Sequence, residues 1–120
     1  MNIRSVPRNL QCFVDSVLEH ADVKFNILGF TETRLDADLN NLYQLPGYNL
    51  FTKCRDRHGG GVAMYISTDL YSTISDEFCR LESFIECLSV ECTISHRRYL
   101  FMCIYRPPRG NVRDFFKNTE

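Results

Sequence analysis

One segment of the sequence ends an apolar run in a side chain that could do chemistry. Residues 26–35 read Asn-Ile-Leu-Gly-Phe-Thr-Glu-Thr-Arg-Leu, so Glu32 follows the apolar residues and lies between two threonines. An apolar run of this length predicts a buried strand, and in open α/β sheets functional groups gather beyond the carboxyl ends of the strands. Glu32 is therefore a candidate functional carboxylate, although a lone acidic residue is more often a solvated loop residue.

The composition predicts one globular domain without a general affinity for polyanions. The 120 residues suffice for a single small domain, and 44% apolar with 24% charged residues is typical of folded proteins. Because the net charge is −1, any contact with nucleic acid would have to be local. No apolar stretch approaches the length of a membrane span and no signal-peptide pattern opens the chain, which favours a soluble intracellular protein.

The six cysteines favour buried thiols over disulfides or a metal site. Cys87, Cys92 and Cys103 lie inside apolar, strand-like runs, and Cys12 lies on an apolar helix face. In such places a free thiol packs like a small hydrophobic group. No Cys-x-x-Cys pair occurs, and no histidine stands at ligand spacing from a pair of cysteines. We therefore expect reduced, structural cysteines.

Periodicity predicts the elements that would position Glu32. Apolar residues at helical spacing indicate an amphipathic helix over 7–20, with a core face formed by Leu10, Phe13, Val14, Val17 and Leu18. Strands are expected at 24–31, 48–52, 62–66, 88–94 and 99–105, with weaker ones at 1–6 and 69–75. A short helical turn is expected over 36–41, a hairpin turn at the glycines of 59–61, a loop over 76–83 and a final helix after Asn111.

These elements predict an α/β (α+β) fold with one mostly antiparallel sheet and helices on one of its faces. The strand at 88–94 alternates apolar and polar residues, so one of its faces would be buried and the other wet. The runs 26–30 and 99–104 are apolar on both sides. Because the chain has too few helices to cover both faces, the second face would be covered by a partner chain, a missing half-domain or nothing.

Six short motifs follow one another along almost the whole chain. They are 2–6 (Asn-Ile-Arg-Ser-Val), 28–35 (Leu-Gly-Phe-Thr-Glu-Thr-Arg-Leu), 45–48 (Leu-Pro-Gly-Tyr), 59–66 (Gly-Gly-Gly-Val-Ala-Met-Tyr-Ile), 86–91 (Glu-Cys-Leu-Ser-Val-Glu) and 104–108 (Ile-Tyr-Arg-Pro-Pro). The series resembles the endonuclease domain of non-LTR (LINE-type) retrotransposons. That domain belongs to the endonuclease/exonuclease/phosphatase superfamily, together with apurinic endonucleases and DNase I.

The resemblance implies a fold, a substrate and three site residues. The family fold is a DNase I-like four-layer α/β sandwich, and the chain matches its N-terminal half, so residues 1–120 would be a single incomplete domain. The family nicks DNA with Mg²⁺ or Mn²⁺, in the nucleus where the target is chromosomal. By resemblance, Glu32 is the metal-binding glutamate, Asn2 lies near the metal and the scissile phosphate, and Tyr105 is the active-site tyrosine.

Other features weigh against activity and leave alternatives open. The family's later Gly-Asp-Phe-Asn and Ser-Asp-His motifs have no counterpart, so a lone Glu32 would bind Mg²⁺ weakly and we expect no useful turnover. Asn2 could be a turn or cap residue, and Tyr105 a core tyrosine with its hydroxyl at the surface. The loop arginines Arg55, Arg57, Arg106 and Arg109 could contact phosphates or simply be solvated.

The alternative function is that of a non-catalytic module that binds a partner through the uncovered sheet face. Self-association through the same face is a further expectation, because an exposed apolar surface is a liability in an isolated chain.

Overall fold

The N-terminal segment leads into a helix whose start and buried face follow from the local sequence. The computed structural model describes residues 1–19, 25–35, 42–53, 60–82 and 85–106. Helix α1 (Val6–Phe13) begins after Ser5, whose hydroxyl accepts a hydrogen bond from the Arg8 backbone N–H at 3.3 Å, an N-cap arrangement. Val6, Leu10 and Phe13 form its buried face, which confirms the predicted core positions Leu10 and Phe13.

The last part of the predicted helix is wound differently. Val14–Leu18 form the π-helical turn η1, closed by a bond from the Glu19 N–H to the Val14 carbonyl at 3.0 Å. A π turn holds more residues than an α turn and rotates the face that the helix buries. Val17, expected in the core, is therefore exposed, whereas Val14 and Leu18 still pack against the hydrophobic core. Cys12 is exposed as well, contrary to its expected place on an apolar face.

Seven strands divide between two mostly antiparallel sheets in the described part of the chain. The first sheet has the order β1-β3-β2, with β1 (Ile27–Thr31), β3 (Val62–Ser67) and β2 (Tyr48–Lys53). In the second, β6 (Ile85–Ile94) pairs with β7 (Arg97–Tyr105), and also with β4 (Tyr71–Ile74) and β5 (Arg80–Glu82). The antiparallel pairing of β2 with β3 and of β6 with β7 confirms the predicted antiparallel arrangement.

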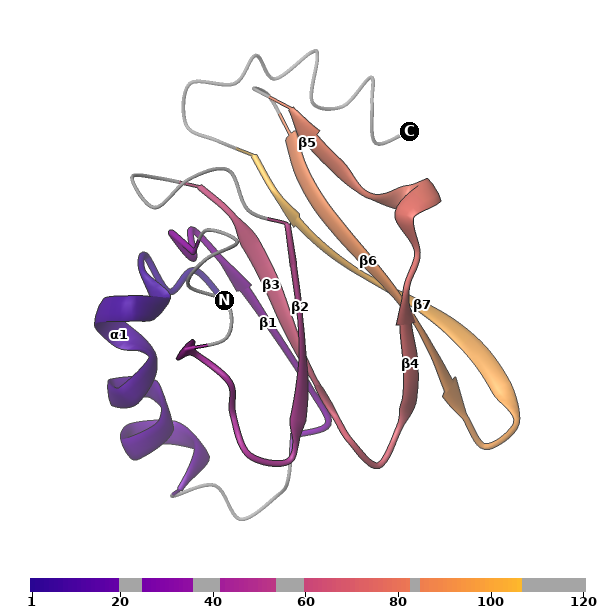
Figure 1. Ribbon diagram of the computed structural model, residues 1–120, viewed down its shortest axis with the longest axis horizontal. Coiled ribbons are helices and arrows are strands. Elements are labelled where there is room, and N and C mark those ends of the chain that lie inside the picture. Colours follow the sequence, from indigo (N-terminus) through magenta and orange to yellow (C-terminus); the bar gives the residue numbers. More distant parts are fainter. Residues whose placement is uncertain (20–24, 36–41, 54–59, 83–84, 107–120) are drawn as a thin grey trace.

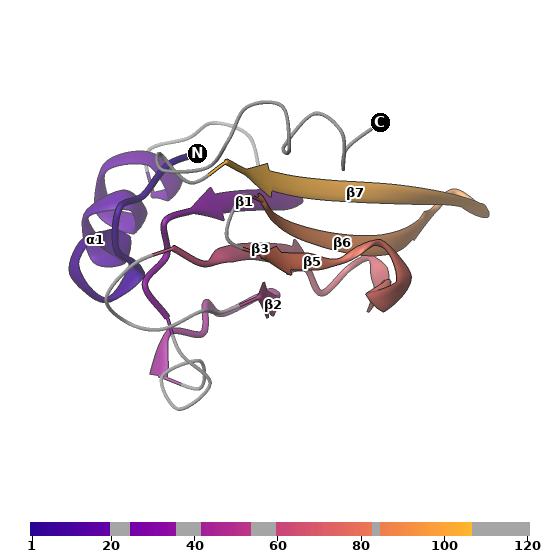
Figure 2. The same cartoon turned by 90° about the horizontal axis from the view of Figure 1, so that it is seen from above.

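The prediction of a single sheet is wrong for these residues, because the two sheets pack face to face. Side chains of β3 and β6, among them Val62, Met64, Leu88 and Val90, form one buried cluster between them. Helix α1 covers the opposite face of the first sheet (Figures 1 and 2). The described elements thus form three layers, a helix and two sheets, in an α+β fold.

The two central strands carry most of the core. Every residue of β3 is buried, and so are Ile85 to Val90 of β6. The expectation of a wet face on β6 is therefore wrong for Ser89, whereas Glu91 and Thr93 on the same face are only half-buried. The short 3-10 turn η3 (Asp76–Phe78) lies over that face, where the Phe78 carbonyl accepts a hydrogen bond from the Ser89 hydroxyl at 2.8 Å. Strand β5 lies in a segment that was expected to be a loop, because three residues carry little periodicity.

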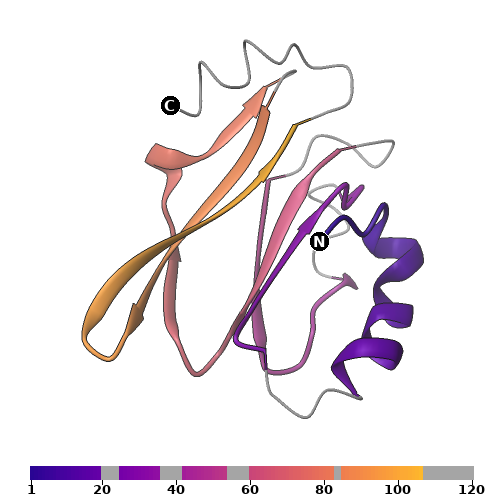
Figure 3. The ribbon, with the colours of Figure 1, turned by 180° about the vertical axis from the view of Figure 1, so that it is seen from behind.

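Strand β7 was expected to be buried on both faces and is not. Its odd-numbered residues Phe101, Cys103 and Tyr105 pack toward the first sheet. Leu100, Met102 and Ile104 alternate with them and are 40–48% exposed. These three residues, with Tyr71 of β4, lie on the outer face of the second sheet. Among the described helices, only the short turn η3 lies at that face, near Ser89, while α1 lies on the far side of the first sheet (Figure 3). The expected uncovered face therefore belongs to the second sheet, because the second sheet itself covers the first.

Several expectations lie outside the described residues. They concern the start of the strand at 24, the turn over 36–41, Cys54 and the helix after Asn111. The strand expected at 1–6 is reduced to one parallel bridge, Asn2 with Thr31. The five described cysteines are free thiols, as expected. Within the described ranges, the helices lack the length and apolar composition that crossing a membrane requires.

Candidate functional site

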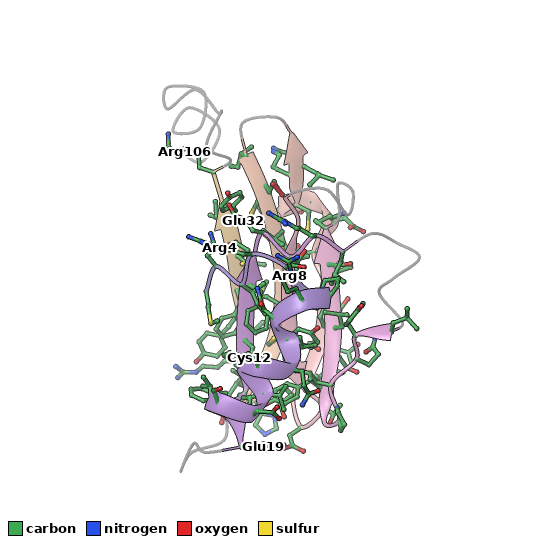
Figure 4. The ribbon with its side chains drawn as sticks, turned by 90° about the vertical axis from the view of Figure 1, so that its left-hand side faces the viewer. Arg4, Arg8, Cys12, Glu19, Glu32 and Arg106 are labelled. Atoms are coloured by element: carbon green, nitrogen blue, oxygen red, sulfur yellow. The ribbon has the colours of Figure 1, made fainter. Side chains whose placement is uncertain are left out.

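The three residues that the sequence singled out lie at neighbouring strand ends. Glu32 follows the last residue of β1, and Tyr105 is the last residue of β7. The Tyr105 hydroxyl donates a hydrogen bond to Glu32 Oε1, although the two residues are 73 positions apart. Because β1 and β7 belong to different sheets, the pair forms only when both sheets are packed. Figure 4 shows Glu32 at this end of the molecule.

Asn2 lies beside the same strand end through its backbone. It bridges Thr31, the residue before Glu32, and two backbone hydrogen bonds of 2.8 and 3.1 Å tie Thr31 to Met1 and Ile3. The Asn2 side-chain oxygen accepts a hydrogen bond from the Arg4 N–H at 3.1 Å. That contact is the local turn role that asparagine often has. The backbone thus places Asn2 next to Glu32, while its carboxamide oxygen bonds within its own turn.

A second carboxylate near the pair escaped the sequence analysis as a site residue. Glu86 is fully buried and lies opposite Tyr105 in the register of β6 and β7. Its Oε2 accepts a hydrogen bond from the Gly61 N–H at 2.6 Å. The sequence does indicate this position, because Glu86 lies two residues before Leu88 and so falls on the same, inward-facing side of the strand as Leu88, Val90 and Cys92. Acidic side chains are rarely fully buried unless they have an interaction partner.

A glycine turn holds the backbone just after Glu32. The Thr33 N–H donates to the Gly61 carbonyl at 3.2 Å, and the Arg34 N–H donates to the Gly60 carbonyl at 2.9 Å. Glu32 and Arg34 have φ angles of 54° and 55°, in the left-handed region that costs side-chain-bearing residues energy. Residues in such conformations persist when the surrounding contacts enforce them, and they cluster at functional sites.

The environment of Tyr105 disfavours its ionisation. Burial, the hydrogen bond to Glu32 and the negative charges of Glu32 and Glu86 together raise the pKa of Tyr105 to about 12. Each of these causes opposes a second negative charge at this point. The hydroxyl therefore remains a proton donor at neutral pH. The pKa of Tyr65, in the core beneath α1, is likewise raised to about 12 by burial.

These two tyrosines predict a loss of stability at high pH. Their pKa values are higher in the folded chain than the ordinary value of 10.0, so between about pH 10 and 12 the unfolded chain releases protons that the folded chain retains. The stability that these two tyrosines contribute is fully present below pH 10 and is lost as the pH rises through this window. Tyr105→Phe and Tyr65→Phe should each make this fall shallower, and the double variant more so, in urea unfolding at pH 9–12. An unchanged slope in both single variants would contradict the argument.

Exposed arginines surround the strand ends that carry the candidate residues. Arg4, Arg34 and Arg106 are exposed and lie within two positions of Asn2, Glu32 and Tyr105. Figure 4 shows Arg4 and Arg106 on the same side of the molecule as Glu32. Sequence reasoning had singled out Arg106 but not Arg4 or Arg34, while Arg55, Arg57 and Arg109 lie outside the described residues. Guanidinium groups in such numbers suit a phosphate backbone.

The donor atoms fit a hard divalent cation in type but not in number. Carboxylate oxygens are the ligands that Mg²⁺ and Mn²⁺ prefer. In the chain as far as it is described, no cluster of three or more His, Cys, Asp or Glu side chains could hold a metal ion. Glu32 could therefore supply one oxygen ligand, with water molecules completing the coordination sphere. Such a site would bind the cation weakly.

No family model matches the sequence, and no curated protein matches it.

Proposed function

We propose that the chain is the N-terminal part of a DNA endonuclease domain of the non-LTR retrotransposon type, with a DNase I-like four-layer fold. The observation that carries the proposal is the hydrogen bond between Tyr105 and Glu32. The motif resemblance singled out these two residues independently of any structure, and they meet across two sheets. Asn2, the third residue of the set, is bridged to the position before Glu32.

In this proposal each residue has a distinct part. Glu32 binds Mg²⁺ or Mn²⁺, and the cation would polarise a phosphodiester and activate water when bound. Tyr105 fixes one oxygen of Glu32 and, with its raised pKa, keeps its proton. Arg4, Arg34 and Arg106 contact phosphates of the DNA, and Asn2 lies beside the scissile phosphate. With one carboxylate ligand, the chain alone would bind the cation weakly and turn over little or no DNA.

Two measurements on Glu32 test this function. Mn²⁺ should broaden the NMR signals of Thr31, Glu32 and Thr33 in the wild-type chain, and Glu32→Gln should abolish the broadening because it removes the charged ligand. The matched control is Glu91→Gln, since Glu91 is a β6 glutamate paired with exposed Arg98 at 3.5 Å. Equal broadening in the wild type and Glu32→Gln would refute a metal role for Glu32.

Plasmid nicking provides the second measurement. We expect any Mg²⁺-dependent nicking by the wild type to be slow, and Glu32→Ala to reduce it to background. Binding of a DNA duplex should weaken as salt rises, because phosphate contacts release counterions. It should also weaken in Arg4→Ala and Arg106→Ala. Salt-independent binding would contradict the placement of DNA at these arginines.

The uncovered face of the second sheet favours a second function, that of a non-catalytic interaction module. Tyr71 is 75% exposed and Met102 is 48% exposed on that face, and clustered exposed apolar side chains mark interaction surfaces. In this alternative the chain binds a partner, or a second copy, through β4 and β7. Equal, absent nicking in the wild type and Glu32→Ala, together with sedimentation that depends on concentration and is lost in Met102→Glu, would favour it.

A further inference from the structure

Glu86 begins one of the motifs that carry the family resemblance, but the resemblance gives it no role in the site. Its carboxylate is buried between the two sheets and accepts the Gly61 N–H at 2.6 Å. Inside a protein a hydrogen bond is electrostatically stronger than in water, because the local dielectric constant is low. The bond therefore anchors the backbone of Gly61 firmly to β6.

The Gly60–Gly61 turn, anchored in this way, holds the segment that follows Glu32. The carbonyls of Gly60 and Gly61 accept the N–H groups of Arg34 and Thr33 at 2.9 and 3.2 Å. A Cβ placed on Gly61 would lie 2.5 Å from Thr33 Oγ1, so the turn and the Glu32 segment are in direct contact. A continuous series of hydrogen bonds thus runs from Glu86 through Gly61 to the residue next to Glu32.

We propose that Glu86 is a positioning residue, whose buried carboxylate holds the Gly60–Gly61 turn and thereby fixes the left-handed backbone that directs Glu32 to Tyr105. Glu86 touches neither substrate nor cation in this role. Left-handed φ at Glu32 and Arg34 is unfavourable by itself, so an external restraint must maintain it. The inference rests on the proposed function only in taking Glu32 as the cation ligand.

Amide hydrogen exchange in Glu86→Gln tests the positioning without any metal. Glutamine preserves the core volume but replaces one carboxyl oxygen with an NH₂ group, so the Gly61 N–H loses one of its two possible acceptors and the bond weakens. We expect the Gly61, Thr33 and Arg34 amides to exchange about fivefold faster together, the ratio for the loss of about 1 kcal/mol. The Asn9 amide, bonded to the Ser5 carbonyl in α1, should exchange as in the wild type.

Two exchange results would overturn the inference. One is faster exchange at Gly61 with unchanged Thr33 and Arg34, which would show that the turn does not transmit the restraint. The other is an equal acceleration at all amides including Asn9, which would show that Glu86 contributes only to global stability. Glu91→Gln, the same substitution at another position of β6, should leave the Gly61, Thr33 and Arg34 amides unchanged.

Mn²⁺ titration separates this inference from the proposed function. The dissociation constant for Mn²⁺ should rise about fivefold in Glu86→Gln relative to Glu91→Gln, with the fold unchanged. If the wild type binds Mn²⁺ through Glu32 and Glu86→Gln binds it equally well, the positioning role is wrong. If Glu32→Gln and the wild type respond alike to Mn²⁺, the metal role of Glu32 fails, and hydrogen exchange alone then decides the role of Glu86.

Discussion

Gly61→Ala is expected to lower the free energy of unfolding by about 2–5 kcal/mol. Two penalties add at this position. The φ angle of 92° is in the left-handed region, which costs an alanine about 1–2 kcal/mol. The added Cβ would also lie 2.5 Å from Thr33 Oγ1, and such overpacking costs about 1–3 kcal/mol. Denaturant unfolding of the full chain measures the sum.

Gly47→Ala is the matched control for this substitution. Gly47 has a similar φ angle of 85°, but an added Cβ would meet nothing within 4 Å. It should therefore show the backbone penalty alone, about 1–2 kcal/mol. The difference between the two variants isolates the contact between the Gly61 turn and Thr33. Equal destabilisation in both variants would mean that the turn can relax away from Thr33.

Phe30→Ala should destabilise the chain by about 3–5 kcal/mol, the usual cost of truncating a buried aromatic side chain. Phe30 is 1% exposed in β1. Its ring meets Phe13 of α1 edge to face with centroids 5.1 Å apart, and Tyr65 of β3 at 5.7 Å. The substitution therefore opens a cavity between the helix and the first sheet. Thermal or urea unfolding gives the loss directly.

Tyr71→Ala provides the comparison for Phe30→Ala. Tyr71 is an aromatic strand residue of similar size but is 75% exposed, so its removal should change the free energy of unfolding by no more than about 0.5 kcal/mol. A loss at Tyr71 comparable to that at Phe30 would indicate that the outer face of the second sheet is covered in solution, for example by a second copy.

Local sequence predicted the elements well where period and capping agree. Ser5 and the spacing of Leu10 and Phe13 specify the start and the buried face of α1. The hairpin of β6 and β7 was also predictable, although its turn is at Ser95–His96, where both φ angles are positive as a two-residue hairpin turn requires. Arg97 and Arg98, which lie between the expected strands 88–94 and 99–105, therefore belong to β7.

The number of sheets could not be read from the same patterns. A strand that is apolar on both sides can lie in the middle of one covered sheet or between two packed layers. The presence of two packed sheets is evident only from the contacts of Leu88 and Val90 in β6 with Val62 and Met64 in β3. The apolar run of β7 led to a wrong prediction of burial on both faces. Leu100, Met102 and Ile104 are as hydrophobic as buried residues but are exposed.

The sequence singled out the members of the candidate site but not their geometry, and their function stays a prediction. Glu32, Tyr105 and Asn2 came from motif order alone, and all three lie at neighbouring strand ends. Glu86 was missed because the strand was expected to begin at Leu88, so Glu86 lay outside it. Its contact with Gly61 depends on how β3 and β6 stack, which no local pattern of residues specifies.

The hydrogen bond between Glu32 and Tyr105 also has a mechanical consequence. Its two partners are attached to different sheets, so any sliding of one sheet over the other would lengthen or break it. Thermodynamic linkage is reciprocal. A ligand that holds Glu32 and Tyr105 together must therefore tighten the alignment of the two sheets, and a substitution deep between them, at Met64 or Val90, must weaken that ligand without touching it.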